Sequence, residues 1–355
     1  MFAHAHTPDS LAREELDHYL ENGWFRMGQT IFTTNFLNFN NELYSAIWLR
    51  VVLADFKEDK TFMQLKKLNS SFRVEIRPAS IDREKESLFA KYKQSVSFNA
   101  SSSIKNLLFG ASDHNIYYTL EINIYDGRHL IACGYFDIGK HSAAGITCFY
   151  DPFYKRYSLG KYLMFLKMEY CKQQGLSYFY PGYFVPGYRS FDYKLKIGKP
   201  AIQFLRLADQ RWFPVADFSQ SMVPIRIMHE KLTELQKALI ARGISSRLLK
   251  YEFFDANIIP DLHGIVLFDF PLLLTRFNAT DNSFDPVITF DIRDRKYHVM
   301  KCVSLWRSNL PDDLHEIFSS DLLKVTDDHY ASEYSSEIAS QIPMFVESSF
   351  ERKQA

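Results

Sequence analysis

The sequence lacks several patterns that mark common functional classes. Its four cysteines include no CxxC pair, so a structural zinc or iron–sulfur site is unsupported. It contains no GxSxG motif, and no cysteine stands in an activating context, so we expect no covalent nucleophile. The longest apolar stretch, residues 264–275, is interrupted by Asp269 and is too short to span a bilayer. With 14 glycines and 13 prolines in 355 residues, long disorder is not expected.

The first residues, MFAHAHTPDS, lack the basic and apolar regions of a signal peptide. Together with the scattered cysteines, which we expect to be buried free thiols, this predicts a soluble cytoplasmic protein with no membrane contact. His4 and His6 have the spacing of a metal pair, but we expect them to be terminal and mobile. No metal site is therefore predicted.

The chain has no net charge, with 42 basic and 42 acidic residues, but the charges are unevenly distributed. Residues 155–199 contain nine Lys or Arg against two acids, whereas residues 312–351 contain ten acids against Lys324 alone. Two solvated faces of opposite sign are the simpler interpretation. The alternative is a basic surface that contacts nucleic-acid phosphates.

Periodicity and turn residues predict a mixed α/β chain with a hairpin at Asp126-Gly127. A three-stranded antiparallel unit before a βαβ unit is the layout of an acetyltransferase-like core. The predicted helices are 13–21, 56–68, 87–95 and 225–242; the predicted strands are 43–52, 72–77, 117–125, 130–138, 142–150, 258–277 and 287–303; the acidic tail from Pro311 is predicted to be helical or mobile.

Residues 149–195 carry the most informative pattern. Asp151-Pro152 ends an apolar strand, and a helix follows with one apolar face formed by Leu159, Tyr162, Leu163, Leu166 and Tyr170. Gly175 stands where a left-handed cap belongs, and residues 176–180 form the next strand. A βαβ unit with a basic turn at the helix start is suited to bind an anion there.

These residues resemble the catalytic region of the arginyl- and leucyl-tRNA–protein transferases. The resemblance covers residues 13–217 and implies a GCN5-type acetyltransferase-like mixed sheet within an α/β (α+β) fold. It divides the chain into an N-terminal α/β domain (1–84), a catalytic domain (85–217) and a C-terminal extension of unknown role (218–355). The matching pieces, in order, are residues 19–28, Tyr150-Asp151-Pro152, Ser158-Leu159-Gly160, Glu169-Tyr170-Cys171, Gly175-Leu176, Gly182-Tyr183 with Pro186-Gly187, and Tyr193-Lys194.

The resemblance implies transfer of an amino acid, of the arginine or leucine class, from charged tRNA to an N-terminal α-amine, with acidic N-termini as the expected acceptors in an N-degron pathway. Charged tRNA is then a co-substrate, and no cofactor is needed. The ester bond that joins the amino acid to the tRNA is already activated, so the enzyme's main tasks are to position the reactants and to provide an oxyanion site. The implied residues are Asp151, Tyr183 and Tyr193 for catalysis; Tyr188, Arg189 and Lys194 for substrate; and Lys155, Arg156, Ser158, Gly160 and Lys161 for tRNA.

Each of these residues also has a purely structural interpretation. Arg156 could be a solvated surface residue, Asp151 could only build a turn, and the tyrosines could only pack. Two functional alternatives also stand: an acyl-CoA-dependent N-acyltransferase of the same fold, and a non-catalytic protein that binds tRNA or peptide. The segment around Arg156 fits a coenzyme A loop poorly, which argues against the first.

The chain also departs from the family pattern at two places. The family's cysteine cluster is absent from residues 33–41, so we expect no metal or redox control at that position. The family's Gly-Cys is Gly187-Tyr188 here, and its methionine is Phe191. Both changes lie near the expected pocket, so the sequence leaves the amino acid and the acceptor open.

Overall fold

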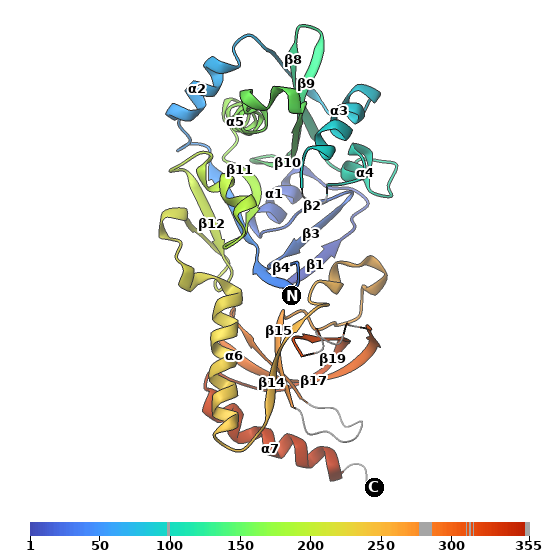
Figure 1. Ribbon diagram of the computed structural model, residues 1–355, viewed down its shortest axis with the longest axis vertical. Coiled ribbons are helices and arrows are strands. Elements are labelled where there is room, and N and C mark those ends of the chain that lie inside the picture. Colours follow the sequence, from blue (N-terminus) through green and yellow to red (C-terminus); the bar gives the residue numbers. More distant parts are fainter. Residues whose placement is uncertain (98–99, 277–285, 310, 312–313, 315, 352–355) are drawn as a thin grey trace.

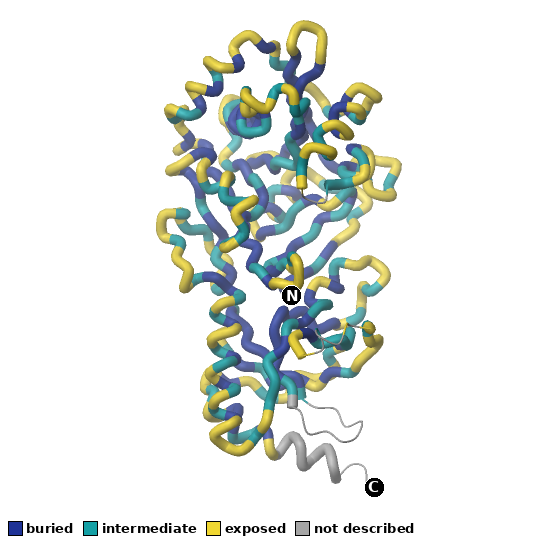
Figure 2. The backbone as a smooth tube through the Cα atoms, in the orientation of Figure 1, coloured by how far each residue is buried: buried dark blue, intermediate teal, exposed yellow. Residues whose placement is uncertain are grey.

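The computed structural model describes residues 1–97, 100–276, 286–309, 311, 314 and 316–351. The molecule is elongated, with an N-terminal and central part above a C-terminal part, and the N-terminus lies between them (Figure 1). Helix α6 (Pro224–Ile240) runs along the side of the C-terminal part. The buried backbone follows the strands of both parts, while the helices and loops at the periphery are more exposed (Figure 2).

The largest sheet among the described residues is mixed and has eight strands. Helix α5 (Leu159–Gln173) packs on one face and α3 (Arg83–Gln94) on the other. In β9, Ala132 and Phe136 join the core beneath α5, whereas Cys133 and Tyr135 join the core beneath α3. Because both faces are covered, this strand is apolar almost throughout. The strand order is β13 (Arg211–Pro214), β12 (Ile202–Arg206), β6 (Ile47–Val52), β11 (Tyr178–Phe184), β10 (Ser142–Tyr150), β9 (His129–Ile138), β8 (Thr119–Asp126) and β7 (Arg73–Pro78).

Strands β10 and β11 run parallel on either side of the α5 crossover, as predicted from the sequence. Their pairing covers Ser142 to Ala144 against Tyr178 to Tyr180 and then stops. Beyond that point Pro181 has no N–H to donate, and β10 has a bulge between Gly145 and Thr147. The two strands therefore separate at their carboxyl ends. This topology confirms the predicted mixed α/β core.

The N-terminal residues form small sheets and connect the two parts of the molecule. Phe2 is fully buried, and its ring centroid lies 5.2 Å from that of Phe36 and 5.0 Å from that of Phe270. Its N–H donates to the carboxylate of Asp269. The elements of this region are β1 (Ala3–His6), β2 (Phe25–Met27), β3 (Thr30–Thr34), β4 (Phe36–Phe39), β5 (Glu42–Ser45), α1 (Arg13–Glu21), α2 (Lys60–Leu68) and α4 (Ile104–Phe109).

The C-terminal part differs from the prediction in two segments. Most of residues 258–271 lie outside regular strands, because Pro260 and Gly264 interrupt the apolar run. The acidic tail is neither only helical nor mobile: it contains β19, whose acids pair with bases, as Asp321 does with Arg307. The elements are β14 (Ser246–Tyr251), β15 (Leu272–Arg276), β16 (Val287–Asp291), β17 (Lys296–Arg307), β18 (Phe318–Ser319), β19 (Asp321–Ser332) and α7 (Ser335–Glu351). Asp312 and Asp313 lie outside the described residues.

His4 and His6 are not mobile, contrary to the sequence-based expectation. They lie on β1, which pairs with β3. The ring centroid of His4 is 4.7 Å from that of His6 and 5.9 Å from that of His263, and His6 lies 4.6 Å from Trp24. Burial and the neighbouring histidines lower the pKa of His4 below its ordinary value, and the pKa of His6 is lowered for the same reasons. The cluster joins β1 to the C-terminal part.

This cluster predicts a loss of stability in mild acid. Because the folded-state pKa values lie below 6.5, the unfolded chain binds more protons in this range. The free energy of unfolding is therefore highest above pH 6.5 and falls as the pH drops toward the lowered pKa values of His4 and His6. Urea midpoints at pH 7.5 and 5.5 should differ less in His4→Asn than in the unchanged protein. The exposed His229, replaced by asparagine, is the control, and an equal acid loss in both variants would contradict the prediction.

Candidate active site

A cavity of about 450 Å³ opens where β10 and β11 separate. Its wall is formed by residues of the β10 bulge, of α5, of α3 and of the 3₁₀ helix η2 (Arg189–Lys196). Neither an aspartate nor a glutamate is among the described residues that line it. The lining residues used below are Phe89, Leu107, Cys148, Gly160, Met164, Lys167, Tyr193 and Lys194.

Lys194 points into this cavity from η2. Its Nζ donates a hydrogen bond to the carbonyl oxygen of Tyr183 at 2.8 Å. The same nitrogen lies 5.3 Å from the ring centroid of Tyr183 and 5.1 Å from that of Phe191. Burial lowers the pKa of Lys194 to about 7. A lysine with this pKa can accept a proton at neutral pH, which an exposed lysine cannot do.

Lys167 enters the cavity from the middle of α5 and is fully buried. In the sequence, Lys167 stands out only as one of the nine basic residues of the segment 155–199. The helical spacing could have predicted its burial, because Lys167 follows Leu163 by four residues and therefore belongs to the predicted apolar face of the helix. Its burial also removes it from any basic surface formed by residues 155–199.

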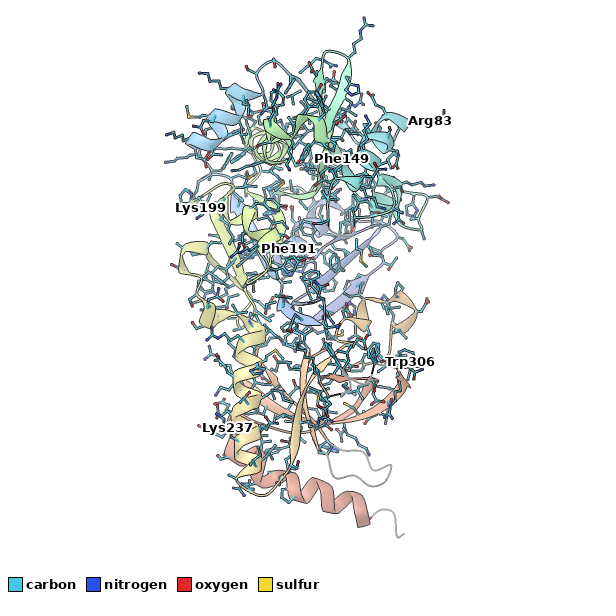
Figure 3. All side chains as sticks on the ribbon, in the orientation of Figure 1. Arg83, Phe149, Phe191, Lys199, Lys237 and Trp306 are labelled. Carbon is cyan, nitrogen blue, oxygen red and sulfur yellow. The ribbon has the colours of Figure 1, made fainter. Side chains whose placement is uncertain are left out.

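Aromatic side chains pack around Lys194. The ring centroid of Tyr183 lies 5.1 Å from that of Trp48, in an edge-on arrangement, and 5.5 Å from that of Phe191. Phe191 is labelled in Figure 3. Tyr188 packs against Phe39 at 4.8 Å rather than entering the cavity. Arg189 is exposed at the start of η2. Of the predicted catalytic and substrate residues, Tyr193 and Lys194 therefore line the cavity.

The turn before α5 holds the residues expected to contact tRNA. Asp151 caps the 3₁₀ helix η1 (Pro152–Tyr157), since its Oδ1 accepts from the N–H of Phe153 at 3.0 Å. Lys155 and Arg156 are exposed, and Lys161 is half-buried. Ser158 adopts a left-handed backbone with φ of 51°. Gly160 lines the cavity, and a Cβ there would lie 3.3 Å from the ring of Tyr150.

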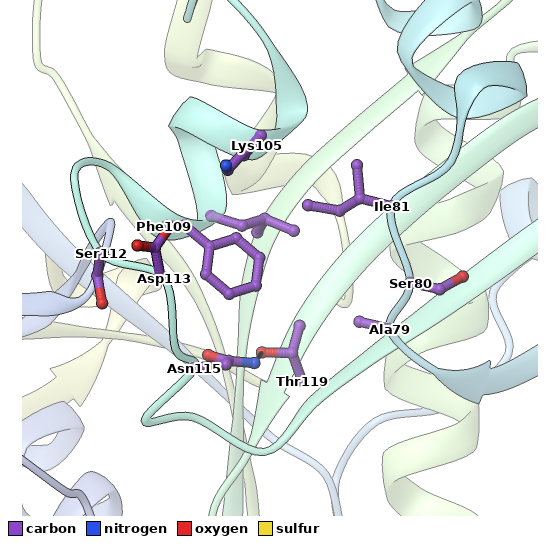
Figure 4. Close-up of a pocket in the computed structure, with 10 residues that line it drawn as sticks. Ala79, Ser80, Ile81, Lys105, Phe109, Ser112, Asp113, Asn115 and Thr119 are labelled. Carbon is purple, nitrogen blue, oxygen red and sulfur yellow. Dashed lines mark hydrogen bonds between the residues drawn. The ribbon is translucent and has the colours of Figure 1, made fainter.

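A second cavity, of about 380 Å³, lies beside α4 (Figure 4). Asn115 and Thr119 line it and are hydrogen-bonded to each other at 3.2 Å. Both also accept hydrogen bonds from Arg26, whose Nη1 lies 2.8 Å from Asp137 Oδ1. This cavity therefore borders a structural ion-pair network and contains none of the predicted site residues. Among the described residues, no cluster of three or more His, Cys, Asp or Glu could hold a metal ion.

Residues 84–203 match the protein family described as the C terminus of arginine-tRNA-protein transferase. A relative from Leptospira interrogans, named aspartate/glutamate leucyltransferase, is 26% identical over 219 residues, which cover 60% of this chain and 83% of that one. A protein of the same name from Campylobacter jejuni is 24% identical and covers 52% of this chain and 78% of its own.

Among solved structures, a GCN5-related N-acetyltransferase from Kribbella flavida is 14% identical, with a TM-score of 0.25 over 43% of this chain and 53% of that one. No described helix has the length and apolar composition to cross a membrane. The sequence matches confirm the predicted resemblance to the aminoacyl-tRNA–protein transferases and the prediction that the chain is an enzyme, an aminoacyltransferase.

Proposed function

We propose that this aminoacyltransferase moves an amino acid of the leucine class from its ester with tRNA to the α-amine of a polypeptide that begins with aspartate or glutamate. The charge of the first cavity is the observation that carries the proposal. Lys167 and Lys194 line it, and no described acidic residue does. The names of the relatives support the same donor and acceptors.

The cavity's charge favours an apolar donor side chain over arginine. A guanidinium would enter beside two lysines with no carboxylate to pair with it, and an unpaired buried charge is costly. Phe89, Leu107 and Met164 instead offer apolar contacts that suit a leucyl side chain.

The same charge favours an acidic acceptor. The exposed Arg189 would attract the carboxylate of the acceptor. Lys194, in its neutral form, would take a proton from the α-ammonium or from the attacking nitrogen, and would then carry a positive charge beside the acceptor. The amine nitrogen then bonds to the ester carbonyl carbon, the bond to the ribose 3′ oxygen breaks, and that oxygen takes up a proton. The hydroxyl of Tyr193 borders the same cavity and is suited to relay it.

The remaining site residues would position these groups. The Tyr183 carbonyl holds Lys194, and Tyr188 supports η2 through Phe39. Asp151 shapes the η1 turn. In this proposal the turn receives the phosphates of the tRNA end through its basic and backbone groups, namely Lys155, Arg156, Ser158, Gly160 and Lys161.

A transfer assay tests this proposal. The purified chain would be incubated with tRNA charged with labelled leucine or labelled arginine, and with peptides that begin with Asp, Glu, Asn or Gln. We expect leucine to be transferred to the Asp and Glu peptides at least about 10-fold faster than arginine, because each mismatched buried charge costs at least about 1.4 kcal/mol. Faster transfer of arginine, or equal use of the uncharged Asn and Gln peptides, would contradict the proposal.

A further inference from the structure

Lys167 is a buried cation with an unusual set of partners. Its Nζ donates to the carbonyl oxygens of Tyr135 at 2.7 Å and Thr147 at 2.8 Å, and it lies 3.3 Å from Cys148 Sγ. No carboxylate lies within ion-pair distance of it in the part of the chain that the structure describes. Its Nζ therefore faces backbone carbonyls and a thiol at hydrogen-bond distance, with the ring centroid of Phe136 5.9 Å away, and the buried Asp137 interacts with it only at longer range.

These contacts lie at the β10 bulge, which shapes the cavity. Thr147 pairs with Tyr135 directly after the bulge, so Lys167 binds the carbonyls of both paired residues from the helix side. Methionine would fill similar space on α5 without the cost of burying a charge. The placement of the charge at the cavity wall thus calls for an explanation beyond packing.

We propose that Lys167 is a positioning residue that fixes the bulge and makes the cavity wall electrostatically positive where the ester carbonyl becomes an oxyanion. The chemical step rests on the proposed function. When the acceptor nitrogen bonds to the carbonyl carbon, the carbonyl π electrons move to its oxygen, and this negative charge is absent from the ester. A fixed positive potential beside that oxygen stabilises this state more than the ester.

Replacing Lys167 with methionine tests the effect on the reaction. We expect the single-turnover rate of K167M to fall about 100-fold, with the KM for charged tRNA unchanged, because the charge acts in the transition state. K167R keeps the charge and should recover most of the rate. A K167M rate within twofold of the unchanged protein overturns the proposal, as does an equal loss in K167R with both variants folded.

Cys148 offers a second readout that needs no transferase activity. The other three thiols are buried, so Cys148 is the preferred target for alkylation, and C148S identifies its signal. Anionic iodoacetate and neutral iodoacetamide both react with the thiolate, so their rate ratio reports the local potential independently of thiolate population. We expect the rate with iodoacetate, divided by the rate with iodoacetamide, to fall about threefold or more in K167M and to stay unchanged in K167R. An unchanged ratio in K167M overturns the proposal, whereas a chain without transferase activity would remove the proposed function and leave this test intact.

Discussion

The single-turnover rate of aminoacyl transfer is expected to fall about 100-fold when Lys194 is replaced by methionine, the low end of the effect of losing a general base. Burial lowers the pKa of Lys194 to about 7, so its neutral form becomes the major form above that pH. The rate of the unchanged protein should therefore rise as the pH increases through about 7 and then level off. K194M should lose the part of this rise that is centred at about pH 7 and keep only the rise due to the acceptor α-amine, whose pKa is about 8. Rapid-quench measurements from pH 5.5 to 9 with saturating charged tRNA and acceptor peptide would record it.

Arginine at the same position separates a proton-transfer role from a purely electrostatic one. Arginine keeps the positive charge but does not release its proton in a protein. If Lys194 is the base, K194R should be as slow as K194M. A K194R variant with nearly the original rate would instead assign Lys194 a charge-only role. Thermal melts of both variants check that the loss is not due to unfolding.

The βαβ unit could be predicted from the sequence because its signals are local. Asp151-Pro152 ends a strand, apolar residues recur at helical spacing from Leu159, and Gly175 has a φ of 75° where a left-handed cap was expected. The separation of β10 from β11 is harder to predict from the sequence. Pro181 is visible in the sequence, but the bulge after Gly145 depends on which residues of β9 lie opposite.

The predictions failed where an apolar or acidic run had no local periodicity. Residues 258–271 are apolar because several of them are buried against the C-terminal core, and this burial does not require a strand. The acidic tail was interpreted as solvated, yet Asp321 and Asp328 are partnered by Arg307 and His298 from β17. Such pairs join distant segments, and composition alone cannot reveal them.

The properties of the site residues also depend on contacts that the sequence alone does not show. Lys194 was identified by its motif, but its low pKa arises from Tyr183 and Phe191 folding around it. From the sequence, Arg26 is identified only as part of the matching segment 19–28, with no role of its own. In the folded chain it is 8% exposed and reaches residues about a hundred positions away. The structure therefore assigns it to packing.

Replacing Arg26 with methionine is expected to destabilise the protein by about 3–5 kcal/mol, the cost of leaving a buried charge without its partner. Arg26 donates to Asp137 at 2.8 Å and to Thr119 at 2.9 Å, and its guanidinium lies 4.4 Å from the ring centroid of Tyr117. Asp137 is fully buried, and burial already raises the pKa of its carboxyl against the opposing effect of Arg26. Equilibrium unfolding in urea would measure the loss, and the rate at which Cys148 in the first cavity is alkylated would check the local structure.

The double variant R26M/D137L separates the lost contact from the orphaned carboxylate. If the carboxylate causes most of the loss, removing it as well should recover a large part of the stability. The single variant should also be less impaired at pH 5 than at pH 8. Without Arg26 the folded-state pKa of Asp137 rises further, so the protonated form carries no penalty at low pH, and stability is lost as the pH rises through that pKa. A double variant as unstable as R26M, with no dependence on pH, would show instead that the hydrogen bonds to Thr119 and to the Leu108 carbonyl carry the effect.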